Sequence, residues 1–102
     1  MKKRVATCLY VIGQETGAAP VKIGVACDPA ARLAQLQCGS PVMLKLFHVH
    51  RVAGDAAHLE GFVHFSLERS RRHGEWFDLL PDEAIEKIRE IEGRMCRVMR
   101  DE

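Results

Sequence analysis

The stretch VKIGVACDPAARLAQLQCGSP, residues 21–41, joins a short apolar segment to an amphipathic one. Asp28 and Pro29 predict a helix start, because an aspartate side chain can accept a hydrogen bond from the first turn and proline fits the first helical position. Gly39 and Pro41 predict where this helix ends. The stretch therefore indicates a strand, a turn and a helix.

One arginine, Arg32, stands beside the apolar stripe of this helix. Leu33 and Leu36 define the stripe, and Arg32 lies four residues before Leu36, at its margin. The arginine stem can cover leucines while its head reaches water. Alternatively, the guanidinium can meet a phosphate, which its planar set of donors fits. Residue patterns alone leave both interpretations open.

The segments on either side of this stretch alternate between strand and helix patterns. Residues 5–12, rich in β-branched and aromatic types, predict a strand that is covered on both faces. A second strand at 21–25 is expected to run antiparallel to it through a loop with two glycines and a proline. Further elements are expected at 41–52 (strand), 55–72 (helix), 74–79 (short extended segment) and from residue 81 (helix).

The second of these helices is expected to start at Asp55 and to continue through about Arg72. Its inward-facing residues are predicted to be Leu59, Phe62, Val63 and Leu67. The element order predicts an α+β fold, with a small three-stranded antiparallel sheet flanked by helices. We expect one domain over residues 1–102, with a core at about 5–80 and a C-terminal helix at 81–102.

Composition is that of a soluble globular protein, with 47% apolar and 28% charged residues. No apolar run is long enough to cross a bilayer, and no leader cleavage site follows the first apolar stretch. We therefore expect a cytoplasmic protein without a membrane partner. The cysteines are not at CxxC spacing and are expected to be reduced. They are Cys8, Cys27, Cys38 and Cys96.

The net charge of +1 argues against a protein that binds nucleic acid through a high overall positive charge. Local charge remains informative. Arg69, Arg71 and Arg72, here called the arginine cluster, fall within four residues. They fit either a solvated helix end or a patch that binds nucleic-acid phosphates.

A set of short motifs resembles the GIY-YIG endonuclease superfamily. Eleven residues separate Tyr10 of CLYVI from Lys22 of KIG, and an arginine in the next helix and a glutamate in a later one follow. With RLAQLQCGSP, LEGFVH and GEWF, the chain is most similar to the compact, phage-associated branch of that group. The resemblance runs from about residue 10 to residue 79.

The resemblance assigns roles to individual residues. Tyr10 matches the tyrosine of the first tripeptide, and Arg32 matches the arginine that stabilises the developing phosphate charge. Glu60 matches the metal-binding glutamate, which implies one Mg²⁺ or Mn²⁺. In the implied reaction, phosphodiester hydrolysis in DNA, Tyr10 with Lys22 or His64 orients or deprotonates the attacking water.

Lys22 departs from the family pattern, because a lysine stands where the second tripeptide has tyrosine. The alternative function is therefore a catalytically impaired nucleic-acid-binding or regulatory module that keeps the fold. His64 follows Glu60 by four residues, so both lie on one helix face. His64 can orient the carboxylate, bind phosphate or assist proton transfer, or it can be a structural histidine with no role in the reaction.

No separate DNA-reading module is evident in the sequence. We therefore expect low sequence specificity for DNA, or specificity that a partner or a homodimer supplies. The sequence leaves open whether the chain is a monomer or a homodimer. A purely structural interaction domain is a third possibility.

Overall fold

The computed structural model describes residues 5–100, with side chains for residues 5–95. The chain enters the fold through two strands, and most of its later half is helical. In chain order the elements are β1 (Cys8–Gln14), β2 (Val21–Ala26), α1 (Pro29–Cys38), β3 (Leu44–Arg51), α2 (Ala57–Ser66), the 3-10 turn η1 (Glu68–Ser70), β4 (Arg71–His73), β5 (Trp76–Phe77) and α3 (Pro81–Arg100).

The strands form one antiparallel sheet in the order β3-β1-β2-β5-β4. The predicted α+β class is confirmed, but the prediction of three strands is wrong, since β4 and β5 extend the sheet to five. These added strands have three and two residues, too few to show an alternating pattern. Gly74 turns the chain between them with a φ of 57°, in the left-handed region that glycine adopts readily.

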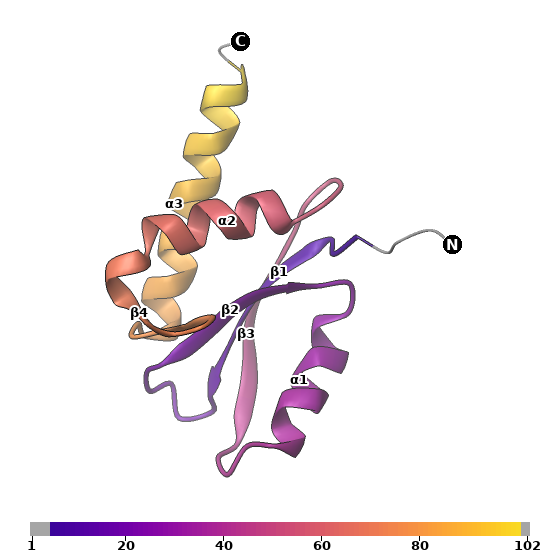
Figure 1. The fold of residues 1–102 in the computed structure, drawn as a ribbon, viewed down its shortest axis with the longest axis vertical. Helices are drawn as coiled ribbons and strands as arrows, with labels where there is room; N and C mark the ends of the chain where they lie inside the picture. Colours follow the sequence, from indigo (N-terminus) through magenta and orange to yellow (C-terminus); the bar gives the residue numbers. More distant parts are fainter. Residues whose placement is uncertain (1–4, 101–102) are drawn as a thin grey trace.

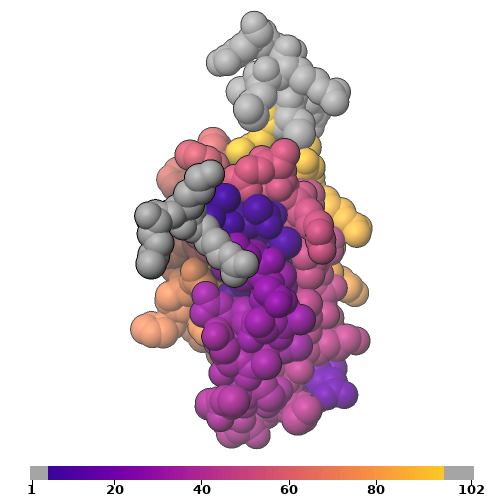
Figure 2. Space-filling view, turned by 90° about the vertical axis from the view of Figure 1, so that its right-hand side faces the viewer, coloured from indigo at the N-terminus to yellow at the C-terminus, as the bar shows by residue number. Residues whose placement is uncertain are grey.

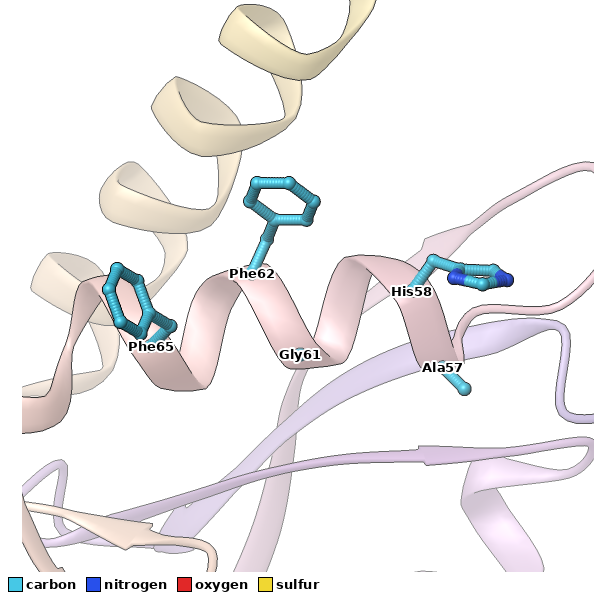
Figure 3. A pocket seen from close by; sticks show the side chains of 5 residues that line it. All are labelled: Ala57, His58, Gly61, Phe62 and Phe65. Carbon is cyan, nitrogen blue, oxygen red and sulfur yellow. The ribbon is translucent and has the colours of Figure 1, made fainter.

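Helices cover both faces of the sheet, as Figure 1 shows with α1 on one side and α2 and α3 on the other. Leu9 and Val11 of β1 pack with α2 and α3 in the larger core. Tyr10 and Ile12, which point the other way, pack with α1. The surface over α1 is seen in Figure 2. A central strand buried on both faces explains why residues 8–12 are almost continuously apolar.

The first and last helices have the expected boundaries. Asp28 caps α1, because its Oδ1 accepts a hydrogen bond from the Ala31 amide at 3.2 Å. The helix ends at Gly39, as predicted. The third helix begins at Pro81 and buries Ala84, Ile88 and Ile91 along one side.

Helix α2 is shorter than predicted. It ends at Ser66 instead of continuing through Arg72, because the chain there turns back through η1 into β4. The turn lets Phe77 of β5 pair with Val21 of β2 and become fully buried. Phe62 was predicted to face inward, yet 55% of its surface is exposed. It is next to Val63 in sequence and therefore points about 100° round the helix from that buried residue.

Three cysteines carry free thiols, as expected: Cys8, Cys27 and Cys38. The side chain of Cys96, like the ends of the predicted domain at residues 1–4 and 101–102, lies outside the described residues. Across residues 5–100, no helix combines the length and apolar character needed to span a membrane.

Candidate functional site

Tyr10 and Gly24 face each other across β1 and β2. The Tyr10 side chain is buried, and its ring occupies the space that a side chain at position 24 would need. A Cβ there would lie 2.5 Å from Tyr10 Oη and 2.9 Å from Glu75 Oε1. The glycine of KIG therefore allows the tyrosine hydroxyl and the Glu75 carboxylate to approach the same point.

Lys22 forms an ion pair with Glu75. Lys22 Nζ lies 2.9 Å from Glu75 Oε1, and only 15% of the lysine side chain is exposed. The ammonium also lies 5.8 Å from the centre of the Trp76 ring, within cation–π distance. The Glu75 carbonyl accepts a hydrogen bond from the Ile23 amide at 3.0 Å, so the turn between β4 and β5 fixes Glu75 beside β2.

Glu60 comes from α2, on the opposite face of the sheet from Tyr10, and reaches the site at the edge of β2. This edge is open because β5 pairs only with Val21 and Lys22. Glu60 Oε2 is buried without a hydrogen-bond partner among the described residues. Burial raises the pKa of Glu60, and the Glu75 carboxyl lies close enough to the Glu60 carboxyl to raise it further.

The two carboxyls respond differently to this shared environment. Burial raises the pKa of Glu60 from 4.5 to about 7, and the charge of Glu75 adds to the increase. Burial also raises the pKa of Glu75, but the hydrogen bond and charge of Lys22 outweigh it, and the net pKa is lowered. The Glu60 carboxyl therefore binds a proton more readily than the Glu75 carboxyl.

Arg32 lies on the exposed surface of α1 and forms no ion pair within residues 5–95. Burial raises the pKa of Tyr10 to about 12, the Glu75 charge adds to this, and the Arg32 charge opposes it. Arg32 is thus within electrostatic reach of the hydroxyl. At neutral pH this hydroxyl is therefore protonated and has a proton to donate to a hydrogen-bond acceptor.

His64 holds the open edge of β2 through a backbone contact. Its Nε2 lies 2.8 Å from the Ile23 carbonyl oxygen. Because a carbonyl only accepts, Nε2 must carry the proton and donate it. The ring also packs against Phe77, with centroids 5.1 Å apart. These contacts fix the position of the imidazole beside the carboxyl pair.

The arginine cluster lies next to this site, on η1 and β4. Arg71 pairs with Glu68 at 3.3 Å and lies over the Phe77 ring, and Arg72 pairs with Asp78. Arg69 is exposed and makes no ion pair in the described part of the chain. Two of the three predicted phosphate contacts therefore have an acidic neighbour.

The structure brings Tyr10, Lys22 and Glu60 together around Glu75, with Arg32 close enough to influence the tyrosine. The roles expected of them stay predictions. Sequence reasoning missed Glu75, although the motif GEWF contains it. Its closeness to Lys22 depends on the pairing of β5 with β2, which no local pattern indicates.

A divalent cation is the cofactor that the sequence led us to expect. Among residues 5–95, no group of three or more histidine, cysteine, aspartate and glutamate side chains is arranged to hold a metal ion. The unpartnered oxygen of Glu60, beside a second carboxyl, nevertheless fits Mg²⁺, which binds one or two carboxylates and retains several waters.

A comparison with protein families matches residues 7–92 to the T5orf172 domain. The chain belongs to the T5orf172 domain family. This family indicates a phage-associated module that is nuclease-like or binds DNA, and assignment to the GIY-YIG superfamily stays a prediction. The matched range contains every predicted site residue. No curated protein and no solved structure matches the chain significantly.

Proposed function

We propose that the chain is a divalent-metal-dependent DNA endonuclease of GIY-YIG type, which hydrolyses phosphodiester bonds. The observation that supports this best is the contact network at the open edge of β2. There the Lys22–Glu75 ion pair meets the carboxyl of Glu60 and the hydroxyl of Tyr10. Groups with strongly shifted pKa values, such as Glu60 and Tyr10, are concentrated at functional sites.

Glu60 is the residue proposed to hold one Mg²⁺ or Mn²⁺. Its buried, unpartnered oxygen and raised pKa fit a carboxylate whose charge calls for a cation. When bound, the ion would polarise the scissile phosphate. Because a cation binds the ionised carboxylate, any proton on Glu60 must be released first.

The remaining side chains act on the phosphate and the water. Arg32, exposed and free of carboxylates, is proposed to stabilise the charge that develops on the phosphate. Tyr10, with Lys22 or His64, orients or deprotonates the attacking water. The raised pKa of Tyr10 favours orientation by hydrogen-bond donation. The arginine cluster is proposed to bind phosphates away from the cleaved bond.

A second candidate is a module that keeps the fold and binds nucleic acid without cleaving it. Two observations favour it. Lysine replaces tyrosine at position 22, and Tyr10 has a pKa of about 12, too high for a base at neutral pH. Either function leaves open whether a partner subunit or another protein supplies sequence specificity.

Plasmid nicking distinguishes the two candidates. The assay compares Mg²⁺, Mn²⁺ and EDTA for the wild type, for Arg32→Ala and for Arg94→Ala, a matched arginine that pairs with Glu90 on α3. If the chain is an endonuclease, the wild type should nick plasmid DNA only when metal is present. Arg32→Ala should lose this activity, and Arg94→Ala should retain it. DNA binding without nicking supports the second candidate. Absence of both activities from the wild type refutes both.

A further inference from the structure

Glu75 makes more contacts in the site than any role proposed so far requires. Its carboxylate forms an ion pair with Lys22 and lies close to the Glu60 carboxyl, while its carbonyl oxygen accepts a hydrogen bond from the Ile23 amide of β2. A glutamate needed only to neutralise one lysine could do so from a flexible surface position. Glu75 instead sits in a turn that the sheet holds in place.

The side chain that Glu75 restrains is intrinsically mobile. Lysine has a four-carbon stem, and its ammonium carries three donors that rotate freely. Here Glu75 takes one donor, and the Trp76 ring covers another side of the ammonium at 5.8 Å. The Lys22 side chain is 15% exposed, so a small part of it remains accessible to a ligand.

We infer that Glu75 is a positioning residue, which holds the Lys22 ammonium at the open edge of β2 to contact a phosphate of bound DNA. This inference rests on the proposed function, since it requires DNA at this site. A charged donor that is already fixed loses less conformational freedom when it binds than a mobile one. Glu75 therefore acts on DNA through Lys22, without touching the DNA.

For removal of the Glu75 carboxylate, the inference and simple electrostatics predict opposite changes in DNA affinity. Removing a carboxylate makes the surface more positive, which by itself should tighten DNA binding. If Glu75 positions Lys22, its removal should weaken binding, because the lysine contact is lost. One phosphate contact is worth about fivefold in affinity at about 0.15 M salt, and about 0.9 in the slope of log affinity against log salt.

The test measures binding of a short fluorescent DNA duplex over a range of salt concentrations, in EDTA so that no cleavage occurs. The proteins are the wild type, Glu75→Ala, Lys22→Met, the double variant and Glu86→Ala. Glu86 is an exposed glutamate of α3 and supplies the same change of charge. Glu75→Asp is added because it keeps the charge but withdraws the carboxylate, and thermal unfolding checks that each protein is folded.

We expect Glu75→Ala and Lys22→Met each to weaken binding about fivefold and to flatten the salt slope by about one. Glu75→Asp should weaken binding in the same direction. In the Lys22→Met background, Glu75→Ala should cause no further loss, and Glu86→Ala should not weaken binding.

Unchanged or tighter binding by Glu75→Ala overturns the inference, and so does an equal loss in both backgrounds. If the wild type shows no salt-dependent DNA binding, the proposed function fails as well, which separates that failure from failure of the positioning role alone.

Discussion

Replacing Glu60 with glutamine should stabilise the fold at about pH 8. In the folded protein the pKa of Glu60 is raised from 4.5 to about 7, first by burial and then by Glu75. The full difference corresponds to about 3 kcal/mol. Because Glu60 is only half-buried, solvent screening reduces this to about 1 kcal/mol. Glutamine removes this penalty and keeps an amide that can donate to Glu75.

The effect should depend on pH in a defined direction. Since the folded state binds the Glu60 proton more tightly than the unfolded state, this group costs no stability below pH 4.5. The wild type then loses stability as the pH rises from 4.5 through about 7. The difference between Glu60→Gln and wild type should therefore be near zero at pH 4.5 and largest above pH 7.

Thermal unfolding in EDTA measures this difference. At about pH 8 the melting temperature of Glu60→Gln should exceed that of the wild type by about 4 to 8 °C. Glu86→Gln, an exposed glutamate on α3, should show no comparable change. Adding Mg²⁺ or Mn²⁺ should stabilise the wild type alone, and Glu60→Gln should not nick plasmid DNA. A lower melting temperature at pH 8, or a difference independent of pH, would refute the reasoning.

Three further outcomes are expected. Gly24→Ala should destabilise the fold by about 1 to 3 kcal/mol in urea unfolding, because its Cβ would lie 2.5 Å from Tyr10 Oη; Gly39→Ala, with no atom within 4 Å, is the control. Neutralising two residues of the arginine cluster should flatten the slope of log DNA affinity against log salt by nearly two, and an unchanged slope would make the cluster a solvated surface. Ile88→Ala should cost about 2 to 5 kcal/mol in the same unfolding assay, whereas Phe65→Ser, at a side chain 83% exposed, should change stability by at most about 0.5 kcal/mol.

The sequence predicts an element correctly where the interactions that bound it are local, and less well where they join residues far apart in the chain. Helix α1 depends on a local cap and a local stop, Asp28 and Gly39, and its bounds were predicted correctly. The end of α2 depends on the non-local pairing of Phe77 with Val21, so a local helical pattern extended it too far. The inward position predicted for Phe62 was also wrong. The prediction relied on the apolar character of the side chain and gave too little weight to its position around the helix.

The candidate site shows the same difference between what the sequence indicates and what only the folded structure reveals. The resemblance assigns Tyr10, Lys22 and Glu60 to one reaction, and periodicity alone did not indicate that they lie together. Glu75 could not be singled out, because an isolated glutamate in an extended segment is most often a solvent-facing charge. Only the register of β5 against β2 places it beside Lys22.

The open edge of β2 bears on how the protein avoids self-association. Unpaired backbone groups on a strand edge can template pairing with a strand of another molecule, the first step of aggregation. At Ile23, just beyond the last paired residue, both backbone groups on this edge already have partners: the amide donates a hydrogen bond to the Glu75 carbonyl, and the carbonyl accepts one from His64 Nε2. The Glu60 carboxyl of α2 lies alongside. The polar side chains gathered for chemistry thus also protect the sheet, and variants that strip them should be examined for solubility as well as for activity.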